Sequence, residues 1–528
     1  MTSKNADSEI QPSFSETSSQ VIDFSDNSSD PDDGLLESIG YKQEFRREFT
    51  RWSTISYAIS ILGVLGSASW ESPLSAGGPT TAIWAWFSGS FFSLCIALSV
   101  AELVSAYPTS GGMYFITKKV FPPDKVPLAA WILGWSNFLG QTAGVASVGY
   151  SVAQMILAAV TMGSVREDGT FAFTPTAEIT VAVSIAVLVC HGIICSFSSK
   201  HLSNMIRYFA PINLLGSVAI SIALLYLTPN KLPASEVFGQ VIDGSGWNSK
   251  GFSFLIGYLS VAWTMTDYDA TAHMSEELHN AAITGPIAIV QAVVVSWIFG
   301  WLLNVAFGFG AGDLNLLLSS PMGNPAAQVF FNAGGRAGGL AMWFWVCLVQ
   351  FFTGITAMLS DTRTCFALAR DEALPMSSTL RKMNTYTQTP LYSVWAVVLA
   401  CCLLNLIALG STQTISGIFG VTAPAMDMSY VAVIAARLYY SAKTETENRI
   451  VIRRGPFRLG RWQKPINAVA VAWVTFVSVI LFFPPEYPVT ALNMNYAVAI
   501  AAFIALFAVA WWYLQARRFY IGPRTEEN

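Results

Sequence analysis

Residues 260–280 read SVAWTMTDYDATAHMSEELHN and place several charged residues next to an apolar run. The residues before Thr264 continue an apolar run, FSFLIGYL (252–259), with the composition of a membrane-spanning helix. Two carboxylates, Asp267 and Asp269, then interrupt the run. A charged residue at that depth costs about 2.5–3.5 kcal/mol on insertion scales, so a helix that keeps two has a use for them. The stretch therefore predicts a membrane helix that breaks to line a polar site.

The composition of the whole chain also indicates a membrane protein. Of its 528 residues, 53% are hydrophobic and 12% are charged, whereas soluble domains carry about 25% charged residues. The predicted membrane spans are 53–75, 80–103, 129–160, 176–197, 206–228, 252–273, 284–309, 338–360, 390–410, 414–438, 466–483 and 492–515. We therefore predict an all-α polytopic membrane protein with about twelve transmembrane helices.

The distribution of Lys and Arg predicts the orientation. With the N-terminus in the cytosol, 24 of these residues fall in cytoplasmic segments, and only Arg166, Lys231, Lys250 and Arg336 fall outside. Cytoplasmic loops carry such an excess of basic residues, so we expect both termini in the cytosol. The basic loops are explained by topology and do not indicate nucleic-acid binding.

Five segments are expected along the chain. They are a disordered acidic cytoplasmic tail (1–34), a ten-helix core (35–440), a basic cytoplasmic loop (441–465), helices 11 and 12 (466–515) and a cytoplasmic C-terminal tail (516–528). The first 34 residues are rich in Ser and Asp and too poor in apolar residues to fold. The seven cysteines lie in or beside apolar runs without metal-ligand spacing, so we expect no metal and no cofactor.

Three motifs resemble those of one transporter family. AELVSAYPTSGGMYF (101–115), AWTMTDYDATAHMSEELHNA (262–281) and DTRTCFALARDEALP (361–375) resemble motifs of the amino acid–polyamine–organocation permeases. With SAGGP (75–79), the match looks like the fungal branch of γ-aminobutyrate, amino acid and choline permeases. The resemblance implies a LeuT-like five-plus-five inverted repeat, with helices 1 and 6 broken around a central substrate site.

Two departures from the family pattern add negative charge near the expected site. Glu71 follows the first break, and Asp267 stands where many relatives have glycine. Both changes favour a substrate with a cationic group, or the uptake of a proton, over a purely neutral ligand.

The candidate residues fall into three groups. The substrate-binding candidates are Gly66, Ser67 and Ala68 at the first break, Trp263, Thr264, Thr266 and Asp267 at the second, and Asn137 and Gln141 on the third span. The candidates for proton coupling or support of the breaks are Asp267, Asp269, His273 and Glu71. The candidates for an inner gate of ion pairs are Glu102, Glu276, Glu277, Arg363 and Arg370.

Several of these residues have two interpretations. Asp269 either caps backbone amides of the unwound segment or contacts the ligand, and Asp267 either pairs with a cation or carries a proton. Glu71 is either functional or merely solvated in an outer vestibule. His273 is either a proton relay or a hydrogen-bonded residue at a helix end. Trp263 is either a gate over the substrate or core packing. Asn137 and Gln141 bind either the ligand or neighbouring helices.

The function expected from these features is secondary active transport of an amino acid or related small amine, coupled to protons, by alternating access. Choline, polyamine or thiamine transport is the alternative on the same fold, and a non-transporting nutrient receptor is another. An intramembrane aspartyl protease is disfavoured, because Asp269 is expected toward the cytoplasmic half of the membrane and Asp313 beyond the outer end of the seventh span, too far apart for a catalytic pair. We expect no enzyme activity and a location in the plasma membrane, with the vacuolar membrane as the alternative.

Overall fold

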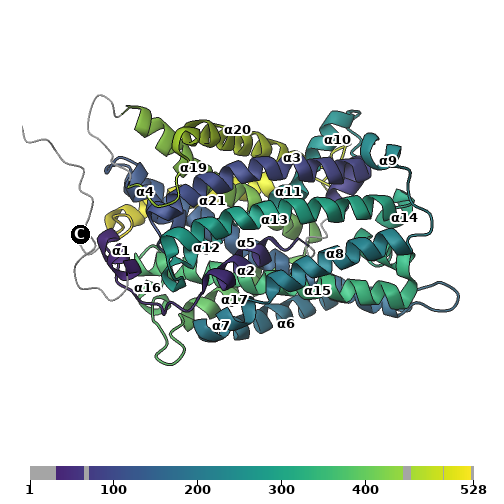
Figure 1. Cartoon of the computed structure of the whole chain (residues 1–528), viewed down its shortest axis with the longest axis horizontal. Coiled ribbons are helices and arrows are strands. Elements are labelled where there is room, and N and C mark those ends of the chain that lie inside the picture. Colours follow the sequence, from purple (N-terminus) through teal and green to yellow (C-terminus); the bar gives the residue numbers. More distant parts are fainter. Residues whose placement is uncertain (1–30, 65–69, 444–452, 492, 525–528) are drawn as a thin grey trace, which may run out of the picture.

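The structure is a computed structural model that describes residues 31–64, 70–443, 453–491 and 493–524. These residues form helices and no strands, and the long helices run side by side along the longest axis of the molecule (Figure 1). The prediction of an all-α polytopic membrane protein is confirmed.

Ten spans in the described residues are long and apolar enough to cross a membrane as continuous helices or helix pairs. They are α3 (Glu71–Ala106), α5 (Val126–Gly163), α6 (Ala177–Cys195), α7 with α8 (Ser199–Ile206, Phe209–Leu227), α13 (Ala281–Gly310), α15 (Pro325–Arg370), α17 (Leu391–Leu406), α18 with α19 (Thr412–Gly420, Thr422–Lys443), α20 (Gln463–Leu481) and α21 (Ala497–Leu514). The other two predicted spans, 53–75 and 252–273, are each broken into shorter helices, as predicted.

The first break follows α2 (Arg51–Leu62). Gly63 ends this helix in the left-handed conformation, with φ of 47°, and its N–H donates to the carbonyl of Ser60. Helix α3 begins at Glu71, and residues 65–69 before it lie outside the described residues. Within α3 the chain bends at Gly78, with φ of 77°, so α3 contains the end of the first predicted span and the whole of the second.

The second break lies between α11 (Tyr258–Thr264) and α12 (Ala270–His273). The preceding α10 (Lys250–Ile256) and the following 3-10 helix η1 (Ser275–Glu277) complete this interrupted span. Asp267 within the break has φ of 64°. This left-handed conformation suits glycine best, and Asn or Asp next, which explains how the chain breaks here without a glycine.

The two ends of the helix bundle differ. We call the end with α1 (Pro31–Ile39), α4 (Gly112–Val120) and α16 (Ser377–Leu380) the termini face, because both described chain ends lie there (Figure 1). We call the opposite end, with α9 (Ala234–Gly239) and α14 (Leu314–Leu318), the loop face. The remaining 3-10 helices are η2 (Ile407–Leu409), η3 (Gly460–Trp462) and η4 (Ala516–Arg518).

Three predicted boundaries change. Helix α1 begins at Pro31, inside the tail predicted over 1–34, of which residues 1–30 lie outside the described residues. Helix α19 extends to Lys443 and α20 begins at Gln463, so the predicted 441–465 loop is shorter at both ends.

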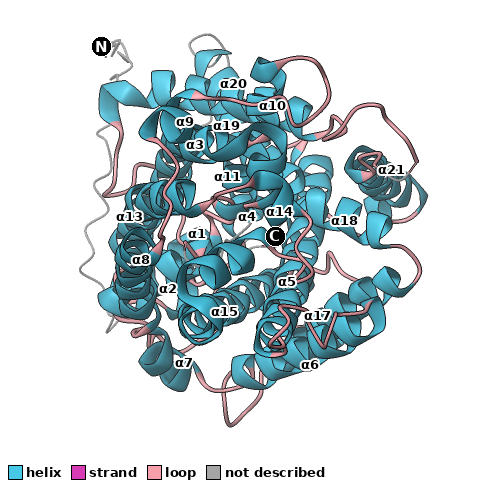
Figure 2. Ribbon diagram, turned by 90° about the vertical axis from the view of Figure 1, so that its right-hand side faces the viewer, coloured by secondary structure: helices cyan, strands magenta, loops and turns pink. Residues whose placement is uncertain are grey.

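The two broken spans share two long helices as neighbours, because α2 and α12 both pack on α13 and α15. Helix α2 packs on α13 and α15, α11 packs on α3, and α5 packs on α15 and α19. Seen along the helix axes, α21 lies at the edge of the bundle (Figure 2), where it packs on α5 and α18. The centre is therefore built from the helices of the predicted repeat, while the last helix is peripheral.

Candidate functional site

A small cavity of about 50 Å³ lies where α2 and α11 both end. Its lining includes the last residues of both helices and side chains from α5, α15 and α19. The polar lining residues are Gln141, Thr264, Thr266, Asp267, Gln350, Thr353 and Thr422. The ends of α2 and α11 therefore meet at one cavity, where the sequence predicted a site between the two breaks. The predicted residues Gly66, Ser67 and Ala68 lie outside the described residues.

Asp267 lines this cavity from the break between α11 and α12. Its Oδ1 accepts a hydrogen bond from Nε2 of Gln141 at 3.4 Å. The Oε1 of Gln141 in turn accepts from the hydroxyl of Thr364 at 2.8 Å. Gln141 thus holds Asp267 at the cavity wall with a neutral donor.

Asp269 is completely buried and is absent from the lining of the cavity. Tyr430 donates to its Oδ1 at 2.7 Å, and His273 and Asn137 reach its Oδ2 at 3.2 and 3.5 Å. The predicted capping of backbone amides is wrong, because the side chain makes no cap hydrogen bond to α12. Asp269 instead ties the break to α5 and α19 through side chains.

His273 and Asn137 belong to this buried cluster. His273 is 2% exposed, and its Nδ1 lies 2.8 Å from the carbonyl oxygen of Ser110. Asn137 also donates to the hydroxyl of Ser429 at 3.2 Å and does not line the cavity. Both residues therefore connect helices around the break.

Two further buried carboxylates lie near the second break, and neither was predicted from the sequence. Asp361 on α15 accepts from the hydroxyl of Thr142 at 3.0 Å, and Asp427 on α19 accepts from Thr266 at 3.4 Å. Both are at most 3% exposed. Asp427 lies inside the predicted span 414–438, so the rule that flagged Asp267 would also have found it.

A second, larger cavity of about 480 Å³ opens on the loop-face side of the first. Trp263 lines both cavities and so lies between them, at the position expected of a gate. Glu71 and Glu486 both line the larger cavity and are exposed. The structure therefore places Glu71 in a vestibule, apart from the small cavity.

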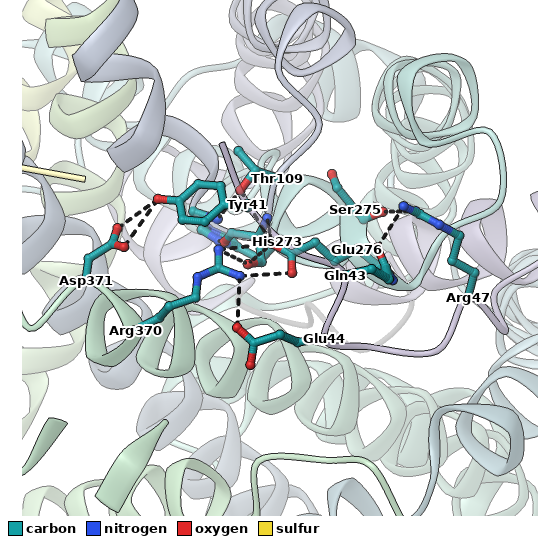
Figure 3. Close-up of polar contacts among 12 residues, drawn as sticks. Tyr41, Gln43, Glu44, Arg47, Thr109, His273, Ser275, Glu276, Arg370 and Asp371 are labelled. Atoms are coloured by element: carbon teal, nitrogen blue, oxygen red, sulfur yellow. Dashed lines mark hydrogen bonds and ion pairs between the residues drawn. The ribbon is translucent and has the colours of Figure 1, made fainter. Parts of the chain in front are cut away.

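The termini-face side of the small cavity is closed by ion pairs. Nε of Arg363 donates to Oε1 of Glu277 at 2.7 Å, and neither side chain is more than 1% exposed. Arg370 donates to both carboxylate oxygens of Glu276 at 3.1 Å (Figure 3). These four residues join the end of α15 to η1. The fifth predicted member, Glu102, lies elsewhere.

Glu102 pairs with a residue that the sequence did not single out. Its Oε2 accepts from Arg437 at 2.8 Å, and its Oε1 accepts from the backbone N–H of Leu459 at 3.2 Å. Glu102 therefore lies outside the ion-pair layer formed by the other four predicted gate residues. Glu102 thus joins the end of α3 to α19 through Arg437, and to the chain after α19 through Leu459.

Residues 31–49, which we call the N-terminal latch, lie across this closed face. The hydroxyl of Tyr41 donates to Oδ2 of Asp371 at 3.0 Å, and Nε2 of Gln43 donates to the carbonyl of Glu276 at 2.6 Å (Figure 3). Arg47 donates to the carbonyl of Leu278 at 3.1 Å. The latch thus contacts both the end of α15 and η1.

The backbone of the latch pairs with the same segment. The N–H groups of Glu48 and Phe49 both lie within 3.1 Å of the carbonyl oxygen of Glu277, and the N–H of His279 donates to the carbonyl of Phe49 at 3.2 Å. Asp32 accepts from the N–H groups of Asn280 and Ala281, at the N-terminal end of α13, at 2.6 and 3.2 Å. Opening at the termini face requires this segment to move.

Two carboxyls in this region have raised pKa values. Burial raises the pKa of Asp371 to about 6, against the opposing effects of Arg370 and of hydrogen bonds from Tyr41 and Tyr114. Burial also raises the pKa of Glu44, again against Arg370. Within the described part of the chain, no group of three or more His, Cys, Asp or Glu side chains is placed to hold a metal ion.

Comparison with known proteins gives one consistent result. Residues 49–506 match the family model described as amino acid permease. The chain is 45% identical to an uncharacterized amino-acid permease of Schizosaccharomyces pombe, over 97% of this chain and 92% of that protein. It is 36% identical to amino-acid permease 2 of Neurospora crassa, over 99% and 96% of the two chains. It is 30% identical to the GABA-specific permease of Saccharomyces cerevisiae, over 94% and 86%.

Proposed function

The chain belongs to the amino acid permease family, and we propose that it moves an amino acid or related small amine by alternating access, with a proton as co-substrate. The observation that carries the proposal is the small cavity between the two helix breaks, lined by Asp267. It lies between a vestibule on one side and a closed ion-pair layer on the other.

The cavity suits an amine. Helices α2 and α11 both end at its wall, at Leu62 and Thr264. The C-terminal ends of helices carry partial negative charge, which favours a cation. Asp267 adds a full carboxylate to the same wall. No Lys, Arg or His is among the described lining residues to oppose these charges.

The two sides of the cavity supply the two gates that alternating access requires. On the loop-face side, Trp263 separates the cavity from the vestibule. On the termini-face side, Arg363–Glu277, Arg370–Glu276 and the N-terminal latch hold α15 against η1. The present conformation is therefore closed at the termini face. Substrate release there requires these contacts to separate.

The proton is proposed because of the charge balance around the second break. Asp267, Asp269, Asp361 and Asp427 surround it, and His273 is the one basic side chain in the described residues that hydrogen-bonds to any of them. Unpaired carboxylates are costly away from water. Binding a proton is a direct way to reduce this charge during the cycle, and Asp267 reaches the substrate cavity.

We place the termini face in the cytosol, because Lys and Arg are concentrated in the segments at that face. We propose the plasma membrane as the location, with the vacuolar membrane as the alternative. The test is accessibility: tags at residues 1 and 528 should be reached by cytosolic reagents, and a tag within 232–248 only from the opposite side. Tags at the two termini found on opposite sides would contradict the topology.

The function is tested by purified protein reconstituted in vesicles. A labelled panel should include γ-aminobutyrate, neutral and basic amino acids, choline, polyamines and thiamine. We expect uptake of at least one amino acid or small amine, stimulated by an inward proton gradient and accompanied by proton entry. Binding without flux would instead indicate a receptor. Uptake of choline or thiamine alone would contradict the proposed substrate class.

A further inference from the structure

Three buried polar side chains of the small cavity lack hydrogen-bond partners among the described residues. They are Thr264 at the end of α11, Gln350 on α15 and Thr422 at the start of α19. Their exposed fractions are 4%, 1% and 2%. Both amide atoms of Gln350 and both threonine hydroxyls are unpaired. Polar groups at this depth are normally paired, so four unpaired atoms facing one cavity require an explanation.

The other polar side chains of the same cavity are satisfied by the protein. Thr353 donates to the carbonyl of Ser60 at 2.9 Å, and Gln141 bonds to Thr364 and Asp267. Thr266 donates to Asp427. The unpaired groups are therefore a distinct subset, contributed by three helices that come together only in the fold.

We propose that Thr264, Gln350 and Thr422 form a subsite that binds an uncharged hydrogen-bonding group of the substrate, a primary amide or a hydroxyl. The inference rests on the proposed function, and it narrows the substrate to small amines that carry such a group in addition to the amine. Asp267 on the same cavity faces the amine, while the three side chains bind the second polar group.

The hydrogen-bonding groups of the subsite favour substrates that carry a primary amide or a hydroxyl. The Gln350 amide offers two donor hydrogens and one acceptor, and each hydroxyl both donates and accepts. A primary amide or hydroxyl of the substrate matches both kinds of atom. A carboxylate only accepts, so it leaves the Gln350 oxygen unpaired, and Asp267 on the same cavity repels it. An aliphatic group leaves all four atoms unpaired.

Water does not remove this preference. Water that occupies the cavity before the substrate arrives can pair with the same atoms. A substrate group that displaces such water without replacing its hydrogen bonds loses affinity. Of two substrates with equal shape, the one that can hydrogen-bond to the subsite should therefore bind more tightly. This difference in affinity can be measured with pairs of amino acids of similar shape.

The experiment compares uptake of asparagine with leucine, and of threonine with valine, by reconstituted wild type and variants. We expect wild type to favour the polar member of each pair by at least tenfold in apparent affinity. Gln350→Leu should reduce the asparagine preference to less than threefold while retaining leucine uptake. Thr422→Val, which removes one hydroxyl, should reduce the threonine preference. Gln154→Leu, the same change at an exposed residue of the vestibule, should leave both preferences unchanged.

The melting temperature of Gln350→Leu distinguishes a role of Gln350 in substrate recognition from a role in stabilising the fold. Because the Gln350 amide is buried without a partner, Gln350→Leu should leave the melting temperature unchanged or raise it. A large decrease, or failure to fold, would contradict the subsite, since it would show that the amide is paired in the native protein. Equal preference within each pair in wild type, or an equal loss for both members in Gln350→Leu, would also overturn it. No uptake of any amine by wild type would instead contradict the proposed function.

Discussion

The guanidinium carbon of Arg370 lies 4.0 Å from the centre of the Tyr41 ring. The same guanidinium donates to both oxygens of Glu276. One arginine at the end of α15 therefore connects the N-terminal latch with η1. The latch and the ion-pair layer form one structure, and loosening either should loosen the other.

Removal of the Tyr41 side chain should release the latch. Tyr41→Ala deletes the cation–π contact and the hydrogen bond to Asp371. We expect hydrogen exchange of the backbone amides of residues 41–49 to become at least tenfold faster, measured by mass spectrometry. Tyr386→Ala is the control, because that ring is 93% exposed. Unchanged exchange in Tyr41→Ala would show that backbone pairing alone holds the latch.

Breaking the buried Arg363–Glu277 pair should be strongly destabilising. Arg363→Gln or Glu277→Gln leaves the other charge buried, at a cost of about 3–5 kcal/mol in the free energy of unfolding. The double variant should recover part of this loss, as measured by denaturation in detergent. The matched control is the exposed pair Arg381–Glu372, at 3.9 Å, where the same substitutions should cost less than about 1 kcal/mol. Additive losses at the buried pair would contradict direct coupling.

Acid should strengthen the latch. Asp371 has a pKa raised to about 6 by burial, so the latched state binds a proton more tightly than a released state in which Asp371 is solvated. The resulting stabilisation is complete below pH of about 4 and is lost as the pH rises through about 6. Burial raises the pKa of Glu44 in the same direction.

The measurement is the protection factor of the 41–49 amides, corrected for intrinsic exchange, at pH 5 and pH 7. Protection should be greater at pH 5, and Asp371→Asn should remove most of the difference. Burial acts to raise the pKa of Glu276, but its ion pair and hydrogen bonds with Arg370 and its hydrogen bonds from Ser110 together outweigh burial and lower the pKa, so Glu276 titrates below this window. Protection that increases from pH 5 to pH 7 would contradict the assignment to Asp371.

Asp267 and Asp269 should respond differently to the same substitution. Asp267→Asn retains the shape and the left-handed backbone but removes the charge at the cavity, and uptake should fall tenfold or more. If Asp267 carries the proton, the variant loses acid stimulation but still exchanges substrate. If it pairs with the amine, the variant loses binding.

Asp269→Asn is the comparison. Asp269 is fully buried among Tyr430, His273 and Asn137, so its substitution should reduce folded yield more than selectivity. Normal uptake by Asp267→Asn, together with weaker substrate binding by well-folded Asp269→Asn, would show that the two roles are reversed.

Gly63 should not tolerate a side chain. Its φ of 47° is strained for alanine, and an added Cβ would contact Oγ1 of Thr353. Gly63→Ala should therefore shift the end of α2 at the cavity and lower uptake at least tenfold. Gly163→Ala is the control, because nothing lies within 4 Å of an added Cβ there. Full uptake by Gly63→Ala would show that the end of α2 is not a fixed part of the site.

Local composition was sufficient to predict the spans and the two breaks. Asp267 interrupts an apolar run, and Gly63 lies where α2 ends. The sequence also placed Glu276 and Arg370 in one predicted inner gate, because both lie beyond the cytoplasmic ends of predicted spans, but it did not specify which residues pair. Asp427 was missed although it carries the same local signal, a carboxylate within an apolar run.

The helical membrane fold and the places where helices break can be predicted from the sequence alone, because apolar length and buried charge act locally along the chain. Which polar residues meet depends instead on how the helices pack in three dimensions. Gln350 and Thr422 look like ordinary helix residues in the sequence, and packing of α15 and α19 around the break brings them to one cavity with Asp267. Packing also separates Glu102 from the other gate residues and lays Tyr41 against Arg370. Such contacts join residues hundreds of positions apart, so no local pattern specifies them.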